Sequence, residues 1–255
     1  MRKWLIFLGA VLCALLLAAG WVAIQLEQTP TLHENPYTVS DFAQDGAFLT
    51  CTAGRSSVGI DVSSHQQDID WQAVAASGVE FAFVRVGYRS YSSGEIQADA
   101  YAMDNLTQAQ AAGLAVGAYF FSQAISVEEA LEEAAFALEQ LEGIALELPL
   151  VYDWEYISES ARTGQVDGQT LTDCTIAFCQ AVEAAGQTPM VYFNTSQALN
   201  MLDMEALAGY GLWLAKYEGG MDFPYRVDFW QYTNTGTVPG ITGNVDIDLR
   251  FYYDH

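Results

Sequence analysis

The sequence is poor in positive charge. Its 255 residues hold 9 Lys and Arg against 32 Asp and Glu, a formal net charge of −23. Two of the cations, Arg2 and Lys3, stand at the extreme N-terminus, which leaves 7 for the rest of the chain. A surface of this sign repels phosphate backbones and anionic lipid headgroups. We therefore expect no nucleic acid among the partners of this protein.

Histidine and cysteine are also scarce. The three histidines, His33, His65 and His255, lie far apart in the sequence, and the four cysteines lack the paired spacing of a zinc site. No glycine-rich phosphate-binding loop follows an early strand. We expect neither a metal nor a cofactor.

Three cysteines lie beyond the apolar N-terminal stretch, at Cys51, Cys174 and Cys179. The last two are five residues apart in a predicted helix, which is poor geometry for a disulfide. We interpret them as small buried apolar side chains, and a disulfide that involves Cys51 stays open.

The N-terminus contains the longest apolar run. It extends from Trp4 to Ile24, directly after the basic Arg2 and Lys3, and is long enough to cross a bilayer as a helix of about 20 residues. We predict that residues 1–26 form a membrane anchor with the basic end in the cytoplasm. A cleaved signal peptide is the alternative, because small residues at 18–20 could form a cleavage site. Both readings place the remainder outside the cytoplasm, anchored or secreted.

The rest of the chain divides into a spacer and one domain. Residues 27–55 are polar and contain Pro30 and Pro36, which is typical of a spacer, although its later part can pack on the domain. Residues 56–255 read as a single domain. Five strand–helix pairs come first, and three strands joined by loops come after Asn194. The pattern predicts an α/β fold, an irregular TIM-like β/α barrel. A doubly wound open sheet is the alternative.

Acidic side chains stand where the predicted strands end. Asp61 follows the first strand, Asp153 and Glu155 end the fourth, and Asp246 and Asp248 lie in the last. Side chains alternate along a strand, so Asp153 and Glu155 share a face, about 6.6 Å apart along the backbone. In a closed barrel that face is the interior, and carboxylates from several strands would converge at one mouth.

Such a cluster of carboxylates indicates acid–base chemistry. Neighbouring carboxylates raise one another's pKa, so one of them can stay protonated near neutral pH and act as a general acid. Paired Asp and Glu without metal-binding histidines are typical of glycoside hydrolysis.

Aromatic side chains accompany the acids, and amphipathic rings suit the faces of sugars. We expect Trp154 to point into the core, because it alternates with Asp153 and Glu155. His65 is expected to line the cleft. The predicted substrate-binding residues are Tyr119, Tyr192, Tyr217, Trp213, Tyr232, His65 and Asp248.

The stretch GIDVSSHQQDIDW, residues 59–71, resembles the opening motif of the glycoside hydrolase family 25 lysozymes, the Chalaropsis-type muramidases. GAYFF, VYDWE, VYFN, LWLAKY, WQYT and GITGNVDIDL come next in the order of that family, and the resemblance covers about residues 58–253. It implies an irregular β/α barrel that hydrolyses the β-1,4 bond between N-acetylmuramic acid and N-acetylglucosamine in peptidoglycan.

The resemblance also implies roles for the acids. Glu155 matches the family's acid/base glutamate, and the companion aspartates match Asp61, Asp153 and Asp246. Asp248 stands where many members have Asn, and Phe120 replaces a histidine that is frequent after the tyrosine of GAYFF. Whether the substrate's acetamido group, an aspartate or a water attacks the anomeric carbon stays open.

Two other functions fit the same residues. A chitinase-like hydrolase also uses an Asp-x-Glu pair at the end of its fourth strand, and a cell-wall module could bind glycan without cutting it. Under every reading the expected partner is the peptidoglycan glycan strand or a related polymer. We expect the protein to be a monomer.

Overall fold

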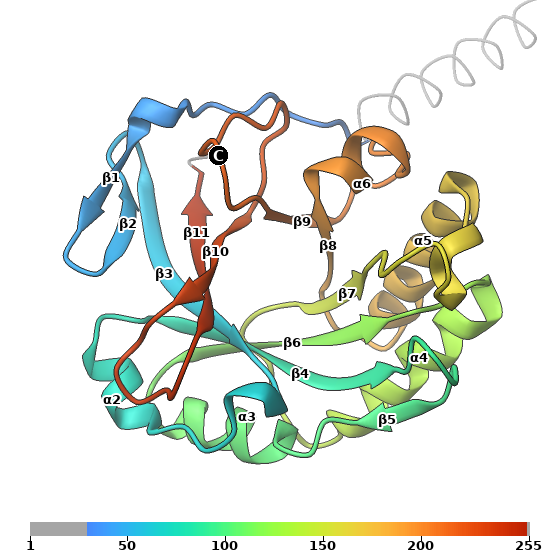
Figure 1. Ribbon diagram of the computed structural model, residues 1–255, viewed down its shortest axis with the longest axis horizontal. Helices are drawn as coiled ribbons and strands as arrows, with labels where there is room; N and C mark the ends of the chain where they lie inside the picture. Colours follow the sequence, from blue (N-terminus) through green and yellow to red (C-terminus); the bar gives the residue numbers. More distant parts are fainter. Residues whose placement is uncertain (1–29, 254–255) are drawn as a thin grey trace, which may run out of the picture.

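The computed structural model describes residues 30–253, and within them eight strands close a barrel (Figure 1). The strands are β3 (Arg55–Val62), β4 (Phe81–Arg89), β6 (Ala115–Ser122), β7 (Leu150–Trp154), β8 (Pro189–Asn194), β9 (Gly211–Ala215), β10 (Phe229–Gly236) and β11 (Val245–Tyr252). Their order is β3-β11-β10-β9-β8-β7-β6-β4, and a pairing of β3 with β4 completes the ring. The short strand β5 (Ile96–Ala98) adds to the end of β4. The ring confirms the predicted barrel against the open sheet.

Helices follow the first five barrel strands, as the sequence predicted. They are α2 (Trp71–Ala76), α3 (Ala102–Ala111), α4 (Val127–Gln140), α5 (Gly168–Ala184) and α6 (Thr195–Asn200). The side chains of Asp70, Ser126 and Asp167 cap α2, α4 and α5 by accepting backbone N–H groups of the first turn. In the described chain no helix separates β9, β10 and β11, which makes the last third irregular.

Strand β11 runs against both of its neighbours. It pairs antiparallel with β10 and with β3, whereas the other barrel strands are parallel to one another. One mouth of the barrel therefore receives the carboxyl ends of seven strands and the amino end of β11. This register pairs Asp246, near the start of β11, with Asp61, near the end of β3.

Large aromatic rings fill the interior below that mouth. Phe83 stacks on Trp213, with ring centroids 4.5 Å apart. Phe229 packs edge-on against Phe81 at 5.3 Å. Gly59 faces this cluster, and a Cβ there would stand 2.1 Å from the Phe81 ring. The absence of a side chain at Gly59 is thus what lets Phe81 occupy the barrel.

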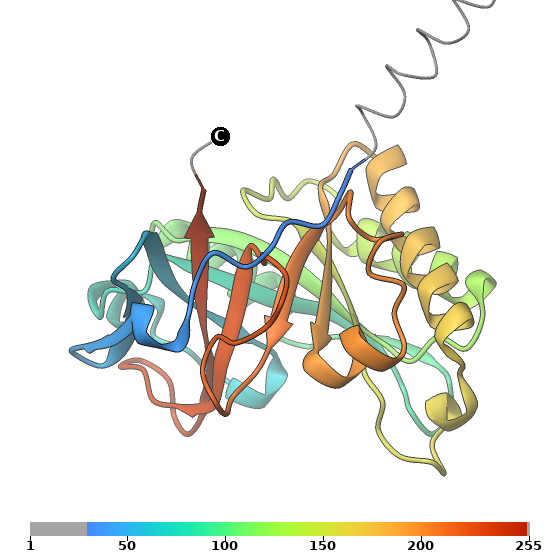
Figure 2. The ribbon, with the colours of Figure 1, turned by 90° about the horizontal axis from the view of Figure 1, so that it is seen from above.

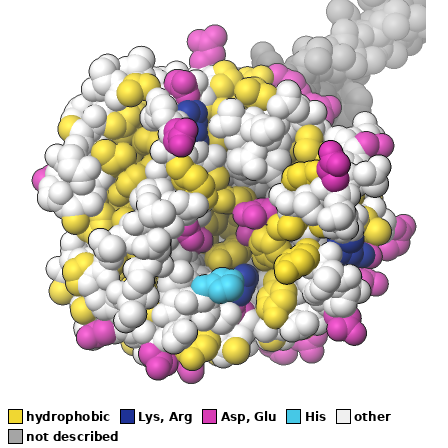
Figure 3. Space-filling model, in the orientation of Figure 1, with side chains coloured by type: hydrophobic (Ala, Val, Ile, Leu, Met, Phe, Trp, Pro, Cys, Tyr) yellow, Lys and Arg dark blue, Asp and Glu magenta, His cyan; other side chains and the backbone are white. Residues whose placement is uncertain are grey.

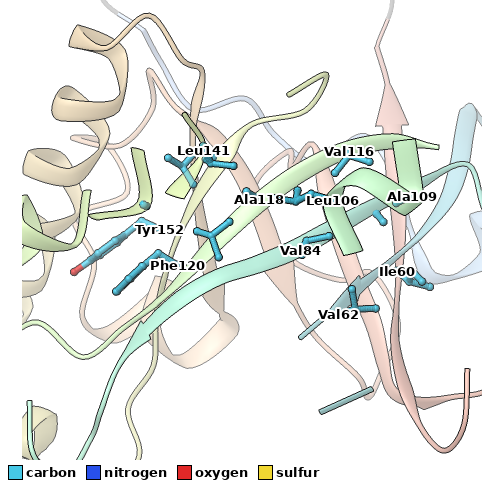
Figure 4. Close-up of a cluster of buried hydrophobic side chains, with 14 of the residues drawn as sticks. Ile60, Val62, Val84, Leu106, Ala109, Val116, Ala118, Phe120, Leu141 and Tyr152 are labelled. Carbon is cyan, nitrogen blue, oxygen red and sulfur yellow. The ribbon is translucent and has the colours of Figure 1, made fainter. Parts of the chain in front are cut away.

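The opposite faces of β3, β4, β6 and β7 carry the main hydrophobic core (Figure 4). Aliphatic side chains of these strands pack under α3 and α4, and burying each one contributes roughly 1.5–3 kcal/mol by removing apolar surface from water. Trp154 belongs to this core at 2% exposure, as the alternation along β7 predicted. The labelled members in Figure 4 are Ile60, Val62, Val84, Leu106, Ala109, Val116, Ala118, Phe120, Leu141 and Tyr152.

The predicted spacer lies on the barrel over the part that the structure describes (Figure 2). It contains the turn η1 (Val39–Asp41) and a hairpin of β1 (Phe42–Asp45) and β2 (Phe48–Cys51). Leu32 and Phe42 pack on the outer core of β8–β11, and Asn35 Nδ2 donates to the Phe223 carbonyl at 2.8 Å. The domain boundary between residues 55 and 56 stays a prediction. Strand β3 begins at Arg55, and the stretch before it packs on the barrel.

Two further expectations concern the cysteines and the N-terminus. Cys51, Cys174 and Cys179 are buried free thiols, so none of these three forms a disulfide, and the last two pack as apolar side chains. The predicted membrane segment, residues 1–26, lies outside the described residues. Between residues 30 and 253, no helix has the length and apolar character needed to cross a membrane.

Candidate active site

A pocket of about 270 Å³ opens at the mouth where the seven parallel strands end and β11 begins. The space-filling view shows acidic side chains near the middle of this face, with a histidine and a basic side chain beside them (Figure 3). The pocket is lined by Asp61, Arg85, Tyr119, Phe121, Asp153, Glu155, Tyr192, Trp213, Tyr217, Gln231, Asn234 and Asp246. It brings together the four carboxylates predicted as catalytic.

The four carboxylates reach the pocket from three strands, β3, β7 and β11. Asp61 is the penultimate residue of β3 and Asp153 that of β7, and both are 6% exposed. Glu155 is the first residue beyond β7, where the chain leaves the sheet. Asp246 enters from the start of β11, because that strand runs in the opposite direction. The predicted convergence is therefore present, although Asp246 lies at the amino end of its strand and not at the carboxyl end.

A glutamine joins one of these acids to two tyrosines. Gln231 Nε2 donates to Asp61 Oδ2 at 2.5 Å. Its Oε1 accepts the hydroxyls of Tyr192 at 2.9 Å and Tyr217 at 2.7 Å. An ionised Asp61 can only accept, so the amide nitrogen faces the aspartate and the amide oxygen receives both hydroxyls. Gln231 is 3% exposed and holds Asp61 and both rings in one arrangement.

Burial and mutual repulsion raise the pKa values of the acids in the pocket. Burial comes first for Asp61, and the charges of Asp246 and Asp248 add to it, outweighing the hydrogen bond from Gln231 that lowers its pKa. The pKa of Asp246 is raised by burial to about 6. Burial and the charge of Asp246 also raise the pKa of Glu155.

Asp153 differs from the other three acids in one of its oxygens. Its Oδ1 is buried and has no hydrogen-bond partner among the described residues. Burial and the charge of Glu155 raise its pKa, and the guanidinium of Arg85 opposes this with a smaller effect. Each ionised carboxylate in the pocket opposes ionisation of its neighbours, which favours retention of a proton within the cluster.

Arg85 supplies the positive charge of the pocket lining. Its Nε donates to Asp99 Oδ2 at 2.9 Å and its Nη2 lies 2.8 Å from the same oxygen. Asp99 Oδ2 also accepts the backbone N–H of Ser64 at 3.0 Å. This pairing holds the guanidinium beside the acids of the pocket.

His65 lies in an adjoining pocket and not among the acids. It belongs to the turn η2 (Ser64–Gln66) and faces a hollow of about 380 Å³ that shares Arg85 and Phe121 with the acidic pocket. Tyr91 and Ile157 also line this hollow and are 56% and 41% exposed. The two pockets therefore adjoin, with Arg85 and Phe121 between them.

Two predicted substrate contacts do not face either pocket. Asp248 is fully buried one layer below the pocket, where its Oδ1 accepts Nε1–H of Trp213 at 2.8 Å. Tyr232 lies on the outer side of β10, and its hydroxyl accepts the N–H of Leu49 at 3.3 Å. The expectation that these two side chains face the groove is wrong. Side chains alternate along β10, so Gln231 points into the barrel and Tyr232 points outward.

Sequence reasoning missed four lining residues, Arg85, Phe121, Gln231 and Asn234. The signal that identified Asp153 was present for two of them. Arg85 is a charged residue within an apolar strand, FAFVRVGY, and Gln231 is a polar residue flanked by aromatic ones in FWQYT. Phe121 stands two residues after Tyr119 and so shares its face. Despite the number of acids, residues 30–253 contain no group of three or more His, Cys, Asp or Glu arranged to hold a metal ion.

Comparison with protein families gives a match to one of them. The family described as glycosyl hydrolases family 25 matches residues 60–241. An uncharacterized protein of Escherichia coli K12, YegX, is 30% identical over 209 residues, which cover 75% of this chain and 68% of YegX.

Two further relatives carry functional names. The autolytic lysozyme of Clostridium acetobutylicum is 28% identical over 193 residues, which cover 74% of this chain and 54% of the lysozyme. The modular autolysin LytC of Streptococcus pneumoniae, solved in complex with a synthetic peptidoglycan ligand, aligns with a TM-score of 0.67 and 25% identity over 77% of this chain. The chain spans about half the length of these two proteins, 54% and 47%.

Proposed function

The chain belongs to the glycosyl hydrolases family 25, and from this premise we propose that it is a peptidoglycan muramidase in which Glu155 is the general acid. The bond cut is the β-1,4 bond between N-acetylmuramic acid and N-acetylglucosamine. The observation that supports this most is the convergence of Asp61, Asp153, Glu155 and Asp246 in one pocket at the barrel mouth. The names of the relatives, a lysozyme and an autolysin solved with a peptidoglycan ligand, agree with the substrate.

The first step of the proposed reaction is protonation of the glycosidic oxygen by Glu155. Its raised pKa keeps a proton available, and the C–O bond breaks as that proton moves to the leaving sugar. Positive charge develops on the ring from which the leaving group departs. Asp61 and Asp246 lie in the same pocket and stabilise that charge.

Asp153 orients the substrate's 2-acetamido group in this proposal. Its buried Oδ1 has no partner within the described chain and can accept the amide N–H. So held, the acetamido oxygen can attack the anomeric carbon as the leaving group departs. Water then opens the cyclic intermediate and returns a proton to Glu155. Attack by an aspartate and direct attack by water are the competing routes.

Aromatic rings hold the sugars. Tyr119, Tyr192, Trp213 and Tyr217 line the acidic pocket and can pack on sugar faces. We propose that the glycan strand continues into the adjoining hollow, where His65 contacts it.

The site of action follows from the substrate. Peptidoglycan lies outside the cytoplasmic membrane, and we propose that residues 1–26 either anchor the enzyme there or direct its secretion. The intact mass of the mature protein tests this, because cleavage at the small residues would remove most of that segment.

The deciding experiment measures release of reducing ends from purified peptidoglycan by the full chain, with mass spectrometry of the fragments and Glu155→Gln alongside. Reducing N-acetylmuramic acid ends that are lost with the variant would establish the proposal. Reducing N-acetylglucosamine ends would assign the protein to the chitinase-like class. Pelleting with the wall without new ends would identify a glycan-binding module.

A further inference from the structure

Glu155 stands one residue beyond its strand, and the backbone there needs partners outside the sheet. The last pairings of β7 are Trp154 with Ser122 of β6 and Asp153 with Tyr192 of β8. The carbonyls of Trp154 and Glu155 are therefore beyond the strand ladder. A buried carbonyl without a hydrogen bond is unfavourable, so other groups must satisfy them.

Two buried glutamines from opposite sides bind these consecutive carbonyls. Gln197 Nε2 donates to the Trp154 carbonyl at 2.7 Å, and Gln123 Nε2 donates to the Glu155 carbonyl at 2.7 Å. Gln123 is fully buried and Gln197 is 3% exposed. Gln123 directly follows β6, whereas Gln197 lies in α6, after β8. The start of the Glu155 loop is thus held from both neighbouring strands.

The orientation of each amide is fixed by its other partners. Gln197 Oε1 accepts the N–H of Asn194 at 2.8 Å in a capping box, which leaves its nitrogen for the Trp154 carbonyl. Gln123 Nε2 also donates to the Ser122 carbonyl at 2.9 Å, so both of its neighbours are acceptors. If either amide were flipped, its oxygen would face a carbonyl oxygen and hydrogen bonds would be lost.

Gln123 also holds the far end of the same loop. Its Oε1 accepts the hydroxyl of the fully buried Thr163 at 3.3 Å. Its own backbone carbonyl accepts Nη1–H of Arg162 at 2.5 Å, and Arg162 is paired through both Nη atoms with Glu129 at 2.7 and 2.8 Å. Arg162 and Thr163 belong to the turn η3 (Arg162–Gln165). Gln123 therefore ties residue 155 to residue 163 through its side chain and holds residue 162 through its backbone carbonyl.

We infer that Gln123 and Gln197 are positioning residues that set the place of the Glu155 carboxyl in the pocket, and that their loss lowers turnover more than substrate binding. The inference rests on the proposed role of Glu155 as general acid. A displacement of about 1 Å of a catalytic group can cost roughly 100-fold in rate. Neither glutamine lines the pocket, so substrate contacts stay in place.

The test uses the full chain with Gln123→Met and Gln197→Met, which keep side-chain length and remove the donor. Thr175→Val is the matched control, because it removes a buried hydrogen bond within α5, to the Leu171 carbonyl at 2.8 Å, away from the pocket. We measure Tm, kcat and KM on soluble glycan fragments, and the pH at which kcat/KM declines on the alkaline side.

Each Met variant is expected to lower kcat by about 10- to 100-fold, with KM within about twofold of the wild type. The alkaline decline, which reports the proton on Glu155, is expected to shift because its distance from Asp246 changes. The control is expected to lower Tm only. Met variants that lower Tm like the control but keep kcat and the pH profile would overturn the inference.

A second variant covers the case in which Gln123→Met does not fold. Gln123→Glu has the same shape, and its acid form can donate one hydrogen bond to the Glu155 carbonyl. Its kcat relative to the wild type is expected to rise as the pH falls, and a constant ratio would overturn the inference. A wild type inactive on peptidoglycan would refute the proposed function itself, whereas an active wild type with unchanged variants would refute the positioning role alone.

Discussion

Replacing Asp248 with asparagine is expected to make the protein less sensitive to rising pH. Asp248 is fully buried, its Oδ1 accepts Nε1–H of Trp213 at 2.8 Å, and its Oδ2 has no partner among the described residues. Burial and the charge of Asp246 raise its pKa well above 3.8, and the Trp213 hydrogen bond only partly opposes this. An asparagine keeps the acceptor for Trp213 and carries no titrating proton.

The sign follows from the direction of the shift. The folded state binds the Asp248 proton more tightly than the unfolded state, so this residue contributes most stability below about pH 4. That contribution is lost as the pH rises toward the folded pKa. The loss amounts to about 1.4 kcal/mol per pH unit within this window. The free energy of unfolding of Asp248→Asn, minus that of the wild type, is therefore expected to increase by about 1.4 kcal/mol per unit from pH 4 upward.

The assay is urea unfolding of both proteins at half-unit steps from pH 4. Asp41→Asn serves as a contrast, because hydrogen bonds from Thr38 lower the pKa of Asp41. That carboxylate stabilises the fold at higher pH and loses its effect as the pH falls through its folded pKa. Because that change falls below the unfolded value of about 4, Asp41→Asn is expected to run parallel to the wild type from pH 4 upward. Parallel curves for Asp248→Asn and the wild type would refute the reasoning on buried acids.

Three further outcomes are expected from the same geometry. A general acid must be protonated, so kcat/KM of the wild type is expected to fall as the pH rises through the raised pKa of Glu155. A rate–pH profile checks this, and activity that increases steadily to pH 9 would contradict it. Gln231→Met removes the link between Asp61 and two tyrosines. We expect the free energy of unfolding to fall by about 1–3 kcal/mol and kcat to fall by more than tenfold, and Thr175→Val is the control for stability alone. Gly59→Ala places a methyl group 2.1 Å from the Phe81 ring, and urea unfolding is expected to show a free energy of unfolding lower by about 1–3 kcal/mol. Gly143→Ala is the control, because open space surrounds Gly143 and the variant reports only the cost of its positive φ of 83°.

The site acids could be predicted because their signal is local. Asp153 and Glu155 interrupt an apolar strand, and the two-residue period alone places both on one face. The βα alternation then predicts which strand ends meet, since parallel strands bring their carboxyl ends to one mouth. Three of the four acids are placed by these two rules.

The direction of β11 and the inward face of β10 could not be predicted from the sequence. Strand direction depends on pairing with distant strands, and no residue near Asp246 encodes it. For β10, the sequence analysis assigned Tyr232 to sugar binding, whereas the structure directs Gln231 to the pocket and Tyr232 away from it. A charged or amide side chain within a buried strand was the better indicator in β4, β7 and β10 alike.

The pocket concentrates groups that a stability-driven design would avoid, and its neighbours limit the cost. Buried acids with raised pKa values lower stability as the pH rises, and they persist here beside compensating contacts. Gln231 donates to Asp61, Trp213 to Asp248, and Arg85 lies near Asp153. Asp153 Oδ1 alone among the four proposed catalytic acids is both buried and without a partner in residues 30–253. The proposed contact with the acetamido N–H requires a free acceptor at this position. The unpaired Oδ1 is unfavourable for stability, and it is the same atom that would accept this N–H.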